Sequence, residues 1–141
     1  MTDPYTITDT CVDRLLREYH IHKRLIVALD FDDTVFDYHG TGDHYTSVLE
    51  IIRECQSLGF YIVLFTGSDK TQWSAQCEYL SKKGIVVDSI NKNPITLPFG
   101  NHGKVYFNIL LDDRSGLGQS IEILSRTVTA IKMGENSDNL S

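Results

Sequence analysis

Short apolar segments alternate with amphipathic segments along most of the chain. Nearly continuous apolar runs rich in β-branched and aromatic residues occur at 25–29 (LIVAL), 60–65 (FYIVLF) and 105–111 (VYFNILL), and a shorter one at 85–87 (IVV). Runs of this length and composition are typical of strands that are buried on both faces, as in a parallel sheet. The pattern therefore predicts four strands.

Apolar residues at helical spacing occupy the segments between these runs. They predict four helices, over about residues 8–20, 48–58, 73–80 and 117–131. Gly59 and Gly84 follow the second and third helices, where glycine commonly ends a helix. Residues 94–103 are predicted as a loop. The alternation of strands and helices favours an α/β fold, a three-layer sandwich with a mostly parallel, Rossmann-like sheet.

The length of the chain fits one domain with one core. It has 141 residues, of which 41% are hydrophobic and 23% charged, as is ordinary for a soluble globular protein. We expect a single domain over residues 1–141, with an N-terminal helix in 1–24, the core in 25–133 and a polar, flexible tail in 134–141.

Hydropathy, cysteine content and net charge argue against a membrane, an oxidising compartment and strong nucleic-acid binding. No apolar run approaches the roughly 20 residues that cross a bilayer, and the first residues do not resemble a signal peptide. Cys11, Cys55 and Cys77 lack Cys-x-x-Cys spacing, so we expect free, buried thiols in a reducing cytoplasm. The net charge of −6, without a Lys/Arg-rich stripe, argues against strong nucleic-acid binding and leaves self-association open.

Acidic and hydroxyl residues directly follow three of the predicted strands. The first run continues into DFDDT (30–34), the second into TGS (66–68), and the last into DD (112–113). The carboxyl ends of parallel strands meet at one edge of the sheet, where open α/β folds bind ligands. Carboxylates crowded there raise one another's pKa or require a cation. The sequence therefore predicts an acidic functional site at this edge.

This set of motifs resembles the haloacid dehalogenase (HAD) superfamily of phosphohydrolases. The four motifs of that family are matched in order over residues 25–124, by Asp30, Asp32 and Thr34, by Thr66, by Lys104, and by Asp112 with Asp113. The chain is most similar to small members of bacterial and phage type, which share the Asp-Asp-Arg ending and an Asn-x-Asn-Pro segment like 91–94. The two positions at which HAD enzymes insert caps span only 35–44 and 90–103 here, so no cap domain is expected.

The resemblance implies an Mg²⁺-dependent phosphomonoester hydrolase with an aspartyl-phosphate intermediate and an open site. Asp30 would be the nucleophile, and Asp32 would protonate the leaving group and then activate water. The ligands of Mg²⁺ would be Asp30, the backbone carbonyl of Asp32, Asp112 and, directly or through water, Asp113.

The resemblance also implies groups that bind the phosphoryl oxygens. Thr66 and the backbone N–H groups of Gly67 and Ser68 would hold these oxygens, and Lys104 would pair with Asp30 and the phosphate. Thr34 would order the loop. The family has a short flap at this position, and we expect specificity to come from residues 36–45, with Tyr38 and His39 selecting the leaving group.

Simpler structural roles remain open for several of these residues. Asp33 is expected to be a turn residue rather than a ligand, and the loop histidines and Lys104 could be merely solvated. The sequence is also compatible with an ion pair of Asp113 with Arg114, a helix N-cap at 68–69, and turn or substrate-facing roles for Asn91 and Asn93.

Two functions of different classes fit the motifs. A hydrolase with an open site would act on a phosphorylated substrate such as a nucleotide, a sugar phosphate or a nucleic-acid end. The second function is that of a non-catalytic HAD-like or receiver-like scaffold. In receivers, however, the acceptor Asp ends a middle strand before the Thr, and the Lys ends the last strand. A pseudoenzyme is expected to lack a chemical group, yet every expected position is filled, so we favour the hydrolase.

Overall fold

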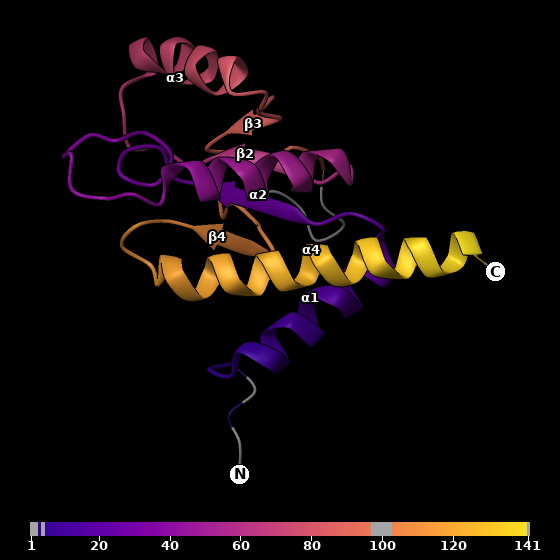
Figure 1. Cartoon of the computed structure of the whole chain (residues 1–141). Helices are drawn as coiled ribbons and strands as arrows, with labels where there is room; N and C mark the ends of the chain where they lie inside the picture. The colour runs from indigo at the N-terminus through magenta and orange to yellow at the C-terminus, as the bar shows by residue number, and fades with distance from the viewer. Residues whose placement is uncertain (1–2, 4, 97–102, 141) are drawn as a thin grey trace.

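The structure is a computed structural model that describes residues 3, 5–96 and 103–140 (Figure 1). Four helices and four strands follow one another in the described chain: α1 (Thr8–His22), β1 (Ile26–Leu29), α2 (Tyr45–Ser57), β2 (Tyr61–Leu64), α3 (Lys70–Lys82), β3 (Ser89–Ile90), β4 (Ile109–Leu111) and α4 (Leu117–Leu140). The four predicted helices are confirmed, and Gly59 and Gly84 follow two of them with positive φ.

The strands form one parallel sheet in the order β3-β2-β1-β4. β1 lies in the middle, where Leu29 is in register with Leu64 of β2 and Leu111 of β4. The carboxyl ends of these strands therefore lie at one edge of the sheet. This all-parallel sheet with its helices confirms the predicted α/β fold, and the described segments contain no cap domain.

Apolar side chains from the sheet and its helices make one core. α1 packs on α4, and α4 packs on α2 and β4 (Figure 1). All four residues of β1 are buried, as expected for the central strand of a parallel sheet. Within the described part of the chain, none of the helices combines the length and apolar character that crossing a bilayer requires.

The predicted strand at 85–87 is wrong. Ile85 is buried, but Val86 is 65% exposed and donates its N–H to Oε1 of Gln56. The strand β3 begins only at Ser89, because Asp88 pairs with Ile62 through its own N–H and its carboxylate instead. The edge strand β3 is therefore shorter than the apolar run at 85–87 and lies after it in the sequence.

The predicted strand at 105–111 is too long. Only Ile109–Leu111 pair with β1 as β4. Asn108 comes just before this paired segment. Its N–H donates to Ile26 O, and its side-chain Oδ1 accepts from Ile26 N at 2.6 Å. Tyr106 N donates to the side chain of Asn93, not to β1. Side-chain amides thus take the place of strand pairing over the first half of this run.

The remaining differences concern the C-terminus, one loop and the thiols. α4 continues to Leu140 through the segment predicted as a flexible tail, which contains no proline to end it. Much of the predicted loop at 94–103 lies outside the described residues. The three thiols are free, with Cys11 and Cys55 buried but Cys77 only half-buried, and burial raises the pKa of Cys55 to about 12.

Neighbouring residues Ile85 and Val86 give a test of the shortened edge strand. Ile85→Ala should lower the free energy of unfolding by about 2–5 kcal/mol, because it empties a buried site. Val86→Ala should cost less than about 0.5 kcal/mol, because this side chain is exposed. Urea denaturation of both variants measures the difference, and equal losses would contradict the described course of the chain.

Candidate active site

A tight turn after β1 presents the first acidic residues. Asp30 N donates to Leu111 O at 2.9 Å, so Asp30 is still held against β4. Phe31 O then accepts from the N–H groups of residues 34, 35 and 36, which closes the turn. Asp33 has a φ of 61°, in the left-handed region where Asp is one of the few tolerated residues. The expectation that Asp33 is a turn residue is therefore met.

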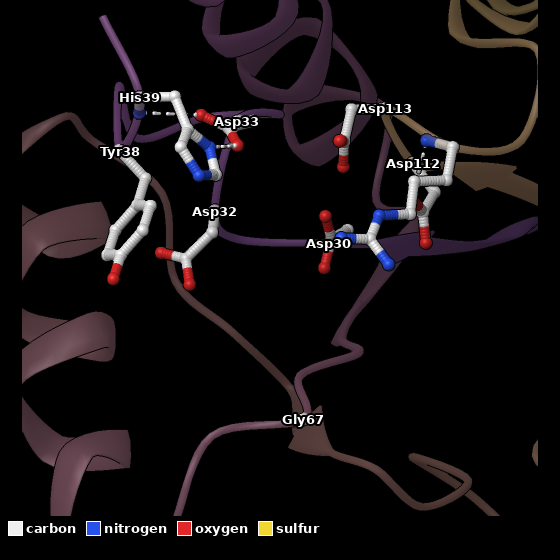
Figure 2. A pocket seen from close by; sticks show the side chains of 9 residues that line it. Asp30, Asp32, Asp33, Tyr38, His39, Gly67, Asp112 and Asp113 are labelled. Atoms are coloured by element: carbon white, nitrogen blue, oxygen red, sulfur yellow. Dashed lines mark hydrogen bonds and ion pairs between the residues drawn. The ribbon is translucent and has the colours of Figure 1, made fainter.

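Three carboxylates converge where β1 and β4 end. Asp30, Asp112 and Asp113 each offer an oxygen, and these oxygens all lie within 4.8 Å of one another. Figure 2 shows the three side chains gathered on one side of the cavity, with Asp32 between Asp30 and Tyr38. The sequence-predicted acidic residues are thus brought to one place.

The buried hydroxyl of Thr34 joins two of these carboxylates. Its Oγ1 accepts from Asp113 N at 2.9 Å and lies 3.1 Å from Oδ2 of Asp30 and 3.4 Å from Oδ1 of Asp113. Thr34 has no exposed surface, so it touches no substrate. Its predicted role of ordering the loop fits these contacts.

Crowding changes the acidity of Asp30. Burial, the adjoining carboxyl of Asp113 and the charge of Asp112 raise the pKa of Asp30 to about 7, against its ordinary 3.8. The hydrogen bond from Thr34 opposes this shift only in part. Without a cation, Asp30 therefore holds a proton in conditions where an exposed aspartate would not.

A cavity of about 460 Å³ opens over the carboxylates. Its lining joins the turn after β1, Gly67 after β2 and the residues after β4, and consists of Asp30, Asp32, Asp33, Tyr38, His39, Gly67, Asp112, Asp113 and Arg114. Tyr38 and His39, which were predicted to face the leaving group, lie in this lining (Figure 2).

Hydrogen bonds to Asp33 hold the flap at 36–45. His39 donates to the Asp33 carboxylate from its backbone N–H and from Nδ1, and these bonds lower the pKa of Asp33 (Figure 2). His44 Nε2 donates to Asp33 O at 2.6 Å. His39 and His44 therefore have defined partners instead of the merely solvated role that was left open for them, and His102 lies outside the described residues.

The turn after β2 carries the predicted oxygen-binding groups. Thr66 Oγ1 accepts from Ser68 N at 3.1 Å. Exposed Gly67 lines the cavity, whereas its half-buried neighbours Thr66 and Ser68 do not line it. Ser68 is held in turn by Trp73 and Gln76 of α3. Asp69 caps α3 by accepting from Thr71 N, so the N-cap role holds for Asp69.

Aromatic contacts tie α3 to the turn after β1. The ring of Phe31 stacks on Phe36 with centroids 5.5 Å apart. Tyr79 meets both rings edge-on at 5.6 and 5.3 Å, and its hydroxyl donates to Val35 O. One helix therefore contacts the turn that carries the first acidic residues of the cavity.

The cationic residue of the cavity is not the predicted one. Lys104 is exposed and lines a separate cavity of about 270 Å³ with residues 91–93, 103 and 105. Arg114 lines the carboxylate cavity instead, and among the described residues no ion pair joins it to Asp113. The sequence signal for Arg114 is its place directly after Asp112 and Asp113, which predicted only a salt-bridge partner.

Comparison with known proteins gives independent support for the fold. A scan against protein-family models and a search of curated proteins found no match. Among solved structures, the chain is similar to a conserved protein coded by a locus from Bacteroides thetaiotaomicron, with a TM-score of 0.59 and 18% sequence identity. The match covers 73% of this chain and 91% of that chain. At this identity the likeness shows a shared fold.

The crowding of carboxylates gives a pH-dependent test of stability. The raised pKa of Asp30, about 7 against 3.8, means that the folded chain binds more protons than the unfolded chain between these pH values. The stability that this proton provides is present at low pH and is lost as pH rises through 7. Asp30→Asn lacks this loss, so in EDTA its stability should rise relative to wild type as pH increases.

Denaturation at a series of pH values measures this difference. Asp43→Asn, which removes a carboxylate outside the cavity lining, serves as the control and should follow wild type. If the difference between Asp30→Asn and wild type did not change with pH, the carboxylates would not repel one another in solution.

Proposed function

We propose that this chain is an Mg²⁺-dependent phosphomonoester hydrolase of the HAD type, with Asp30 as the nucleophile. The observation that carries the proposal is the convergence of Asp30, Asp112 and Asp113, with Asp32 lining the same cavity. Carboxylates placed so close together at the carboxyl edge of a parallel sheet reduce stability, and a bound cation offsets that cost.

The carboxylate cluster suits a hard divalent cation. Oxygens within 4.8 Å of one another are spaced closely enough for three ligands to share one small ion. Asp30, Asp112 and Asp113 would hold Mg²⁺, together with the backbone carbonyl of Asp32. When bound, Mg²⁺ supplies positive charge that neutralises phosphoryl oxygens and lets an anionic nucleophile approach them.

Two aspartates divide the chemistry between them. The Asp30 carboxylate attacks phosphorus, and the bond to the leaving oxygen breaks to give an aspartyl-phosphate. Asp32, exposed and lining the same cavity, donates the proton that the leaving oxygen needs. Asp32 then accepts a proton from the water that hydrolyses the aspartyl-phosphate.

Groups on the two other sides of the cavity bind the phosphate. Gly67 N–H, with Thr66 and Ser68 beside it, donates to the phosphoryl oxygens. Arg114 provides a fixed positive charge on the wall formed after β4. Lys104 stays in the proposal as a second cation for the phosphate, although its side chain would have to extend there from the separate cavity that it lines.

The open cavity supports a proposal for the class of substrate. No cap covers it in the described part of the chain, so the walls available to a leaving group are the flap residues Tyr38 and His39. A phenol ring and an imidazole suit a nucleotide, a sugar phosphate or a nucleic-acid end by stacking and hydrogen bonding. A non-catalytic scaffold is less favoured, because a scaffold does not need the acidic residues crowded into one cavity.

Replacing the nucleophile tests the chemistry. Asp30→Asn should lower the turnover of p-nitrophenyl phosphate by at least about a thousandfold, because an amide does not form the aspartyl-phosphate. Turnover by wild type should require Mg²⁺, and Asp112→Asn should raise the Mg²⁺ concentration for half-maximal rate. Asp43→Asn should keep the wild-type rate. A folded Asp30→Asn variant that retains turnover would refute the mechanism.

Replacing the flap side chains tests specificity. The double variant Tyr38→Ala and His39→Ala should reorder the kcat/KM values for nucleotides, sugar phosphates and 3′-phosphorylated oligonucleotides. Hydrolysis of p-nitrophenyl phosphate should fall by less than about tenfold, because neither side chain takes part in bond breaking. An unchanged order among the natural esters would place specificity outside the flap.

A further inference from the structure

The side chain of Asn91 completes the backbone pairing of Thr66. Asn91 N donates to Leu64 O at 2.9 Å, which continues the ladder between β2 and β3. The φ of 54° at Asn91 then turns its backbone out of the sheet. Its amide takes over from there: Oδ1 accepts from Thr66 N at 2.9 Å, and Nδ2 donates to Thr66 O at 2.7 Å.

These two hydrogen bonds make Asn the residue type that the position requires. A left-handed φ is strained for most side chains but is tolerated by Asn. The pair of bonds also needs one donor and one acceptor in the plane of a short side chain, which the Asn amide provides. Asn91 is therefore more than a turn residue, and its amide faces the protein rather than a substrate.

The same segment contacts the chain that leads into β4. Tyr106 N donates to Oδ1 of Asn93 at 2.7 Å, and Nδ2 of Asn93 lies 3.5 Å from Lys104 O. The Asn-x-Asn segment is thus bonded on one side to Thr66 and on the other to the segment that carries Lys104. Both neighbours hold groups that the proposed function assigns to phosphate.

We propose that Asn91 is a positioning residue that fixes Thr66 directly beside Gly67 of the carboxylate cavity. This inference rests on the proposed function. Thr66 Oγ1 accepts from Ser68 N, so the Thr66 hydroxyl is held against the turn that follows it, and a shift of the Thr66 backbone would move both. Loss of the Asn91 amide would leave both backbone groups of Thr66 without these partners and free the turn to move.

Three variants separate positioning from general stability. Asn91→Gly removes the amide without straining the positive φ, and Asn91→Asp keeps an acceptor for Thr66 N but sets a carboxylate oxygen against Thr66 O. Asn108→Ala is the matched control. Oδ1 of Asn108 also accepts from a backbone N–H, that of Ile26, but this bond lies at the start of β1, at the edge of the sheet away from the site. Each of the three variants therefore loses at least one hydrogen bond between a side-chain amide and the backbone.

The expected results differ between the two ends of the sheet. Asn91→Gly should lower kcat with p-nitrophenyl phosphate by about a hundredfold, since small misplacements of binding groups cost this much. Asn91→Asp should lose less than Asn91→Gly. Half-maximal Mg²⁺ should stay within about twofold of wild type, because the carboxylates lie after β1 and β4. Asn108→Ala should keep kcat within about threefold despite its lower stability.

A double-mutant cycle asks whether Asn91 acts through Thr66. Combining Asn91→Gly with Thr66→Val should be little worse than Thr66→Val alone, because both changes disable the same group. Additive losses in kcat would overturn the proposal, as would equal losses from Asn91→Gly and Asn108→Ala.

Hydrogen exchange of the Thr66 amide provides a readout that is independent of turnover. In Asn91→Gly it should become at least about tenfold faster, while the amides of Ile62 and Val63 in β2 stay protected. Unchanged exchange at Thr66 would refute the positioning role even if kcat falls. If wild type hydrolyses no phosphate ester but Thr66 exchange accelerates, the proposed function fails and the anchoring of Thr66 stands.

Discussion

The register between β1 and β4 is the constraint on which the site depends. Leu29 is paired with Leu111, so the next residue of each strand, Asp30 and Asp112, leaves the sheet at the same level. The bond from Asp30 N to Leu111 O holds that level. Side chains alternate between the two faces of a sheet. If β4 shifted by one residue relative to β1, the side chains of β4 would therefore move to the opposite face and the buried leucines would leave their sites in the core. Packing of the core therefore also fixes the distance between the carboxylates.

The sequence was sufficient to predict the elements that burial determines. The apolar runs that end at residues 29, 65 and 111 supply the interior of β1, β2 and β4, and a parallel sheet follows from their alternation with helices. Asp30 and Asp112 could be placed together for the same reason, because strand ends share one edge. This reasoning uses only hydropathy and the geometry of parallel sheets.

Hydropathy did not reveal where pairing by side chains replaces pairing by the backbone. Asp88, Asn91 and Asn108 each bond through a side chain to a neighbouring strand or its continuation. Polar residues like these carry no hydropathy signal for pairing, and this is why two strands were predicted in the wrong place or at the wrong length. The cavity position of Arg114 was missed for a related reason: side-chain direction after a strand depends on the turn, which composition does not specify.

The contact of Phe31, Phe36 and Tyr79 has a consequence for how related sequences can differ. Two of these rings come from the turn after β1 and the third from α3, which begins at the turn after β2. A change in the size of one ring opens a gap or a clash at the other two. We therefore expect these three positions to vary together among homologues, while the surfaces around them diverge independently.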